Sequence, residues 1–178
     1  MPLSTVLGAQ SLVQPAVCTT ATRPASPYTG QAIYDTTTAT QLIWNSTAWV
    51  GVGTMDVSRV NTTQQTSSIS YAGLTTAQTL TLTTGTKALV ILSFNSYGTV
   101  GIDTYASVAV SGATTTAASD TNSAYIQSTL SGGYGFSASN AIPLTLTAGS
   151  NTFTMQFRAS TASVTSFNNR SMTVIGYS

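Results

Sequence analysis

The sequence predicts an all-β protein, with a small three-stranded β-meander followed by an antiparallel jelly-roll β-sandwich. Several segments alternate apolar and polar residues, which is the pattern of a strand with one buried face. Gly, Asn, Ser and Thr separate these segments, and none of them has the period of an amphipathic helix. Only 5% of the 178 residues are charged but 42% are hydrophobic, so the chain has enough apolar side chains for a folded core.

Residues 1–21 are predicted to form an extended N-terminal docking arm. Six aliphatic residues occur among the first seventeen, with neither a strand nor a helix period. This content is high for a flexible tail, which is the alternative, and it favours docking on a neighbouring subunit or on the structure that carries the protein. The candidate anchor residues are Leu3, Val6, Leu7, Leu12, Val13 and Val17.

Residues 22–54 form the predicted meander, a small collar after the arm. Asn45 and Ser46 are suited to a tight turn between its last two strands. Three strands of about five residues bury too little surface to fold alone, so this segment needs a neighbour. Trp44 and Trp49 are predicted to pack inside the collar as large apolar side chains, and the alternative is that they form a surface on which a sugar stacks. The predicted strands are 32–34, 41–44 and 47–52.

Residues 55–178 have the length of a single β-sandwich domain. Short apolar-rich segments follow one another, with turn-forming residues between them, and eight such strands fit a jelly roll. The predicted strands are 67–71, 79–83, 88–94, 105–110, 124–130, 142–146, 152–158 and 171–177.

Two of these strands predict an oligomer. Residues 152–158 alternate strictly, whereas residues 88–92 and the last strand are apolar on both faces. A strand with two apolar faces needs cover on both sides, and a second subunit can supply the outer cover. The alternative is cover by the chain's own loops, which are polar and poorly suited to it. The candidate interface residues, with the two collar tryptophans included, are Leu89, Ile91, Val174, Ile175, Tyr177, Trp44 and Trp49.

The composition argues against an enzyme. The chain has no histidine and no glutamate, so it lacks the base of a Ser-His-Asp or Cys-His arrangement and any imidazole ligand for zinc. An acid–base pair would have to come from four isolated aspartates, which are ionised at neutral pH unless strongly perturbed. We therefore predict no catalytic residues and no cofactor. The aspartates are Asp35, Asp56, Asp103 and Asp120.

Nucleic acid, membrane and metal partners are not indicated either. The five basic residues are scattered, without the cluster that neutralises a run of phosphates. No apolar run approaches the roughly eighteen residues of a membrane span. Residues 119–122 contain one Asp and one Asn in a pattern like part of a calcium loop, but calcium needs more oxygen ligands, so a turn is favoured.

The collar contains a series of short motifs that keep their order and spacing over some thirty positions. They are Arg23-Pro24-Ala25-Ser26-Pro27, Gly30-Gln31, Ile33-Tyr34-Asp35, Trp44-Asn45 and Ala48-Trp49-Val50. In these motifs the collar resembles a short module that recurs in fibre and minor tail proteins of tailed bacteriophages. The resemblance implies a virion component, on the capsid or the tail surface, without implying which.

Three segments of the sandwich region, residues 86–90, 144–158 and 169–175, carry a second resemblance. Residues 144–158 and 169–175 are similar to the closing strands of the C1q/TNF-like jelly rolls of phage and bacterial proteins, and residues 86–90 are similar to an earlier strand of that group. The resemblance implies a compact homotrimer whose loops are available for contacts.

Two functions remain open from the sequence. The first is a short trimeric fibre or tail-tip protein that attaches to the host, with a host surface glycan as a candidate partner. The alternative is a capsid decoration or head-fibre protein that binds the shell through its N-terminal arm. A non-viral C1q-like binding module is a third reading, but it leaves the collar unexplained.

Overall fold

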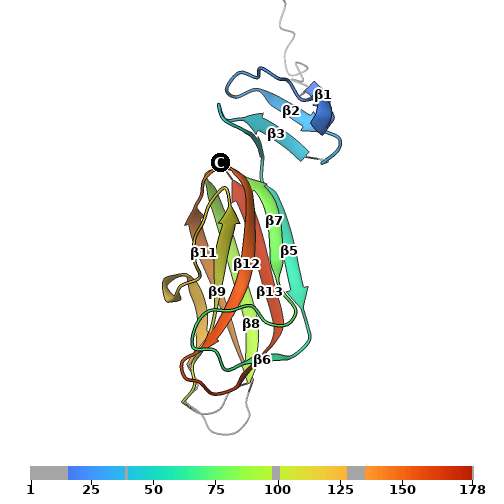
Figure 1. The fold of residues 1–178 in the computed structure, drawn as a ribbon. Coiled ribbons are helices and arrows are strands. Elements are labelled where there is room, and N and C mark those ends of the chain that lie inside the picture. The colour runs from blue at the N-terminus through green and yellow to red at the C-terminus, as the bar shows by residue number, and fades with distance from the viewer. Residues whose placement is uncertain (1–15, 39, 98–100, 128–134, 178) are drawn as a thin grey trace, which may run out of the picture. The chain divides into compact units, whose positions relative to one another are not determined.

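The computed structural model describes residues 16–38, 40–97, 101–127 and 135–177 (Figure 1). The chain divides into two compact units, Met1–Trp49 and Val50–Ser178, which are described separately. None of the described residues is α-helical, and strands dominate both units. The larger unit is an antiparallel jelly-roll sandwich, as the sequence predicts.

The small unit is built on a four-stranded sheet with the order β1-β2-β3-β4. The three predicted strands are present, and a fourth, β1, pairs in parallel with β2. The sequence prediction places the residues of β1 in the arm, because three residues are too few for a recognisable alternation. The strands are β1 (Ala16–Cys18), β2 (Ala32–Asp35), β3 (Thr40–Trp44) and β4 (Trp49–Gly51), with a 3-10 turn, η2, at Thr20–Thr22.

The predicted turn at Asn45 and Ser46 is present. Ser46 has a φ of 82°, and the Asn45 side-chain oxygen accepts hydrogen bonds from the backbone N–H groups of Thr47 at 3.0 Å and Ala48 at 2.8 Å. Asn favours such turns because its side chain can bond to the backbone two or three residues further on. The turn lets the chain return to the sheet as β4.

The core of the small unit is a cluster of Ile33, Leu42 and Trp49, with Cys18 and Trp44 packed against it. The two indole rings are 5.5 Å apart at 60°. Trp49 is buried, so it packs within its own chain. Large rings of this kind supply much of the buried apolar area that a sheet this small can reach.

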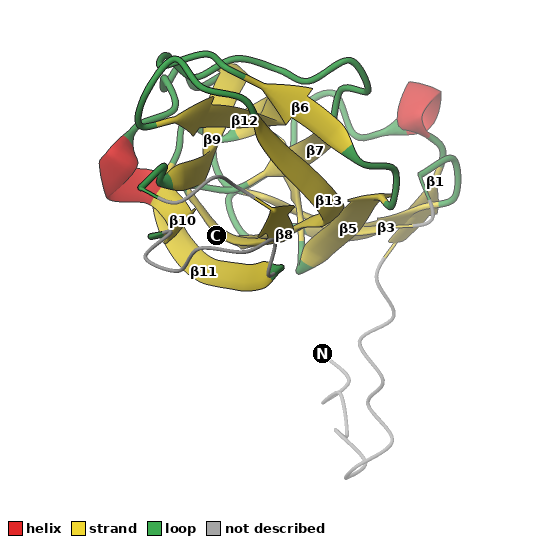
Figure 2. Cartoon of the chain, turned by 90° about the horizontal axis from the view of Figure 1, so that it is seen from below, coloured by secondary structure: helices red, strands yellow, loops and turns green. Residues whose placement is uncertain are grey.

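The sandwich has two facing sheets (Figure 2). One has the order β11-β8-β13-β5, with β6 paired to β13, and the other has the order β10-β9-β12-β7. All of the pairings are antiparallel. The strands of the first sheet are β5 (Thr54–Val60), β6 (Gln64–Thr66), β8 (Lys87–Tyr97), β11 (Phe136–Thr145) and β13 (Thr165–Tyr177). Those of the second are β7 (Thr79–Thr84), β9 (Thr104–Gly112), β10 (Ser123–Ile126) and β12 (Gly149–Ala159), and a 3-10 turn, η3 (Asp120–Asn122), precedes β10.

The core lies between the two sheets and is centred on aromatic side chains. Phe157 on β12 packs edge-on against Phe167 on β13 with ring centroids 4.8 Å apart, and Phe94 on β8 lies 5.3 Å from Phe167. All three rings are fully buried. They join the alternating inward residues of both sheets in one continuous core, as expected of a sandwich.

The structure corrects one strand prediction and adds two strands. Residues 67–71 do not form a strand: the Ser68 hydroxyl donates to the Ser70 carbonyl at 2.6 Å, which bends the backbone there. Strands β5 and β6 were not predicted, since the inward positions of β5 include small polar side chains that conceal the usual alternation. The predicted strand 124–130 corresponds to β10, and residues 128–130 lie outside the described residues.

A buried arginine in β13 was not indicated by the sequence. The register of β13 shifts between Asn168 and Ser171, and Asn169 has a φ of 45°. Within this bulge Arg170 is fully buried, its Nη2 donates to Gln64 Oε1 at 2.9 Å, and its guanidinium carbon lies 5.4 Å from the Phe157 ring centroid. Burial lowers the pKa of Arg170, because removal from water disfavours the charged form.

Candidate functional site

The outer face of the β5–β13–β8–β11 sheet carries two apolar rows that run across the strands. In the first row, Leu89 lies opposite Pro143 on one side and Ile175 on the other, and Ile175 lies opposite Met55. In the second row, Ile91 lies opposite Ala141 and Thr173, and Thr173 lies opposite Val57. We call this surface the outer apolar face and define it by Leu89, Ile91, Ile175, Met55 and Val57.

Among the described residues, no loop covers the outer apolar face. Met55 is 64% exposed and Val57 is 37% exposed, while Leu89, Ile91 and Ile175 are partly exposed. Tyr177, at the end of β13, is 39% exposed and lies opposite Lys87. A row of apolar side chains in water across four adjacent strands is the kind of surface that a partner covers.

The structure separates the residues predicted for an interface. Leu89, Ile91, Ile175 and Tyr177 point outward from the same sheet. Val174 points inward, is fully buried in the core and has no surface to offer a partner. The two tryptophans belong to the small unit.

Sequence reasoning missed Met55 and Val57, the two most exposed members of the face. They alternate with Thr54, Asp56 and Ser58 on β5, so their apolar side chains share one face. That alternation was the available signal. In β5, however, the apolar side chains face outward, whereas an alternating strand is usually assigned with its apolar side chains facing the core.

Of the six residues predicted to anchor the protein, only Val17 is described. It lies on β1 and is 70% exposed. Leu3, Val6, Leu7, Leu12 and Val13 lie outside the described residues.

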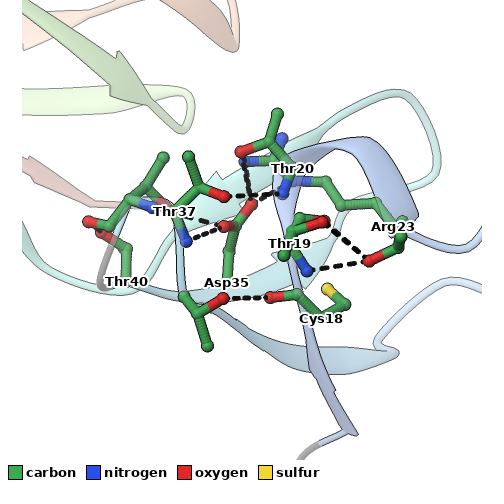
Figure 3. A network of polar contacts seen from close by, with 10 residues as sticks. Cys18, Thr19, Thr20, Arg23, Asp35, Thr37 and Thr40 are labelled. Carbon is green, nitrogen blue, oxygen red and sulfur yellow. Dashed lines mark hydrogen bonds and ion pairs between the residues drawn. The ribbon is translucent and has the colours of Figure 1, made fainter.

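A polar network in the small unit surrounds the buried carboxylate of Asp35 (Figure 3). Arg23 Nε and Nη2 both lie 2.6 Å from Asp35 Oδ2, and the Thr20 hydroxyl donates to the same oxygen at 2.9 Å. The backbone N–H groups of Thr37 and Thr38 donate to Oδ1 at 2.8 and 3.3 Å. The carboxylate therefore ties the segment after β1 to the end of β2.

Burial alone raises the pKa of Asp35, but the hydrogen bonds from Thr20, Arg23, Thr37 and Thr38 outweigh it and lower that pKa from 3.8 to about 2. A carboxyl whose pKa is lower in the folded than in the unfolded chain stabilises the fold above the unfolded pKa. This contribution is lost as the pH falls from about 4 towards 2. Asp35 is thus a structural group that makes the small unit sensitive to acid.

We expect tryptophan fluorescence to report this sensitivity, because both tryptophans of the chain lie in the small unit. Wild-type emission should shift to the red as the pH falls below about 4. The Asp35→Asn variant, which lacks the charged acceptor for Arg23, should already be shifted at pH 7. Asp56→Asn, at an exposed aspartate of the sandwich, is the control and should behave as wild type. An identical pH profile for Asp35→Asn and wild type would contradict the assignment.

The described part of the chain contains no group of three or more Asp, Glu, His or Cys side chains arranged to hold a metal ion. Asp120, weighed as part of a calcium loop, instead pairs with Arg158. No helix among the described residues is long and apolar enough to cross a membrane.

The strand order and register define the class of this protein, which is an antiparallel jelly roll. Solved structures that are similar to it include a TNF protein and a viral chain. An Eiger TNF from S. frugiperda is 11% identical with a TM-score of 0.40, over 67% of this chain and 94% of that chain. A chain of the infectious bursal disease virus Gx strain structure is 14% identical with a TM-score of 0.44, over 72% of this chain.

This chain spans 33% of the length of the viral chain. No protein-family model and no curated protein matches the sequence. Because the two structural similarities are weak, the jelly-roll class rests on the order and register of the strands themselves.

Proposed function

We propose that this chain is a non-enzymatic structural protein of the surface of a tailed-phage virion, and that it forms a short homotrimeric fibre or tail tip that attaches to the host. The outer apolar face carries the proposal. Its five apolar side chains are exposed or partly exposed, and they lie on adjacent strands of one sheet.

The occupants of the outer apolar face are two further copies of this chain, which meet around a threefold axis. The chain has a formal net charge of +1 and few charged residues, so two copies repel each other weakly. Every copy of the chain carries the same apolar face, so other copies are always available to cover it. Cyclic symmetry closes such contacts into an assembly of finite size. A threefold arrangement brings Leu89 and Ile175 of each copy out of water together.

The place on a virion is supported by the resemblance of residues 23–50 to the recurring phage module. The Arg23–Asp35 pair of this network lies within the module and joins its beginning to its centre. The network therefore accounts for an Arg and an Asp twelve positions apart in the quoted pattern. The first and the central motif of the module must therefore occur together for this pair to form.

Labelling of the protein in intact particles tests its position. We expect antibodies against the sandwich to mark one end of the tail in electron micrographs. Labels spread evenly over the head would replace the tail reading with capsid decoration, and the absence of label from purified particles that contain all other virion proteins would overturn the virion assignment. A control antibody against the major capsid protein shows that the head is accessible.

A further inference from the structure

A charged side chain lies inside the sandwich with two unused hydrogen-bond donors. Arg170 is fully buried, and its guanidinium carbon lies 5.4 Å from the centroid of the buried Phe157 ring. Its Nη2 donates to Gln64 Oε1 at 2.9 Å, while Nε and Nη1 have no hydrogen-bond partner among the described residues. A guanidinium stays protonated in proteins, so the positive charge remains at neutral pH.

The chain has few groups that can neutralise this charge. It has only four acidic side chains in all. Two of them are used elsewhere, since Asp35 pairs with Arg23 and Asp120 pairs with Arg158, and no described carboxylate lies within ion-pair distance of Arg170. A buried charge without a counter-charge is strongly destabilising. An anion from solution is the remaining source of compensation.

The neighbours of Arg170 connect the two sheets and lead towards the surface. Gln64 lies on β6 and is half-buried, and its Oε1 also accepts a hydrogen bond from the backbone N–H of Thr76 at 3.1 Å. Its Nε2 donates to the Thr76 hydroxyl at 2.6 Å. Thr76 is exposed and lies in the segment before β7, which belongs to the other sheet. A chain of hydrogen bonds therefore runs from the buried guanidinium to the surface of the sandwich.

A second buried amide lies beside the backbone of Arg170. Gln78 is 1% exposed, and its Nε2 donates to the Arg170 carbonyl at 3.2 Å. Its Oε1 has no partner among the described residues. That oxygen is an acceptor, so it requires a donor, which a water molecule supplies and an anion does not. The unused N–H groups of Arg170 require an acceptor instead, and an anion is the acceptor that also neutralises their charge.

We propose that the sandwich binds one chloride ion, which accepts a hydrogen bond from a free N–H group of Arg170 and acts as its counter-ion. A monatomic anion is favoured because the side chain has no exposed surface against which a larger oxyanion can lie. The planar guanidinium directs Nε–H and the Nη1–H groups to different sides, so the ion takes one of the two positions. The inference does not depend on a place on a virion. It makes the stability of the sandwich depend on chloride, because only the folded chain forms the site.

Bromide tests the site directly, since it replaces chloride and is located by its anomalous scattering. Crystals of the full-length protein soaked in sodium bromide should show an anomalous peak within hydrogen-bond distance of Arg170 Nε or Nη1. The Arg170→Gln variant should lack this peak. Arg59→Gln removes an exposed arginine of the neighbouring strand β5 and is the matched control, which should retain the peak. No peak, or a peak without anomalous signal as for a water molecule, would overturn the proposal.

Urea unfolding followed by circular dichroism tests the site in solution, with chloride and gluconate compared at equal ionic strength. A site with a Kd of about 10 mM shifts the unfolding equilibrium about tenfold towards the folded state at about 100 mM chloride. We expect this shift for wild type and Arg59→Gln but not for Arg170→Gln. An equal response of wild type and Arg170→Gln would overturn the proposal, and a bromide peak would then report binding at crystal concentration only. Should Arg170→Gln fail to fold, the bromide map of wild type decides.

Discussion

The Leu89→Asp substitution should convert the proposed trimer into a folded monomer. Leu89 lies in the middle of the outer apolar face, with Ile175 and Pro143 opposite it. In a trimer the substitution places three carboxylates in an apolar contact without cationic partners, which is among the costliest changes an interface can undergo. In a monomer the same carboxylate is partly exposed to water, so the sandwich itself should tolerate it.

Light scattering measures this outcome. Wild type should have three times the chain mass of 18.3 kDa, and Leu89→Asp should have the mass of one chain with an unchanged far-UV circular dichroism spectrum. Thr79→Asp, at an exposed position on the outer side of the other sheet, is the control and should remain trimeric. Ile175→Asp gives a second measurement should Leu89→Asp precipitate. A well-behaved wild-type monomer, or a trimer in both Asp variants, would end the trimer hypothesis.

The Phe157→Ala substitution should have the largest effect on the stability of the sandwich. Phe157 is 1% exposed, packs against Phe167 and lies beneath the guanidinium of Arg170. Truncation of a buried Phe typically costs about 3–5 kcal/mol, through lost burial and a residual cavity. The loss should fall at the upper end of this range, since the buried Arg170 charge also loses the ring face on which it rests.

Urea unfolding followed by circular dichroism gives the free energy of unfolding of the sandwich, whereas tryptophan emission follows the small unit alone. Phe136→Ala, at a partly buried ring near the edge of the same core, is the matched control and should cost clearly less. A loss below about 1 kcal/mol for Phe157→Ala would show that the core relaxes around the cavity and that the packing of Phe157 is not central.

Several strands were predictable because their signal is local. In β12 the residues from Thr152 to Arg158 alternate between polar and apolar, and the structure buries Phe153, Met155 and Phe157 and leaves the others nearer water. The turn at Asn45 and Ser46 was predictable for the same reason, since its hydrogen bonds connect residues two and three positions apart. Signals of this kind need no knowledge of the rest of the fold.

The pairing partners of the candidate sites were not predictable in this way. Arg170, Gln64 and Gln78 come from distant parts of the sequence, and each side chain alone has an ordinary surface role there. Only the pairing of β6 with β13 and the closing of the two sheets bring them together. Register is decided by which face is buried and by how the sheet twists, which are properties of the whole sandwich.

The sequence by itself determined that this protein is all-β and that its charge is low. It also determined that Leu89 and Ile91 lie on one side of a strand that is apolar on both sides, and that the other side of this strand is buried. The side chains of any strand alternate with a period of two, so this pattern can be recognised in the sequence without knowledge of the fold. Only the tertiary structure decided that Val174 belongs to the core, that Arg170 is buried within a bulge, and that Met55 joins Leu89 across β13. These depend on contacts between residues far apart in the chain, and such contacts form only when two sheets close on one core.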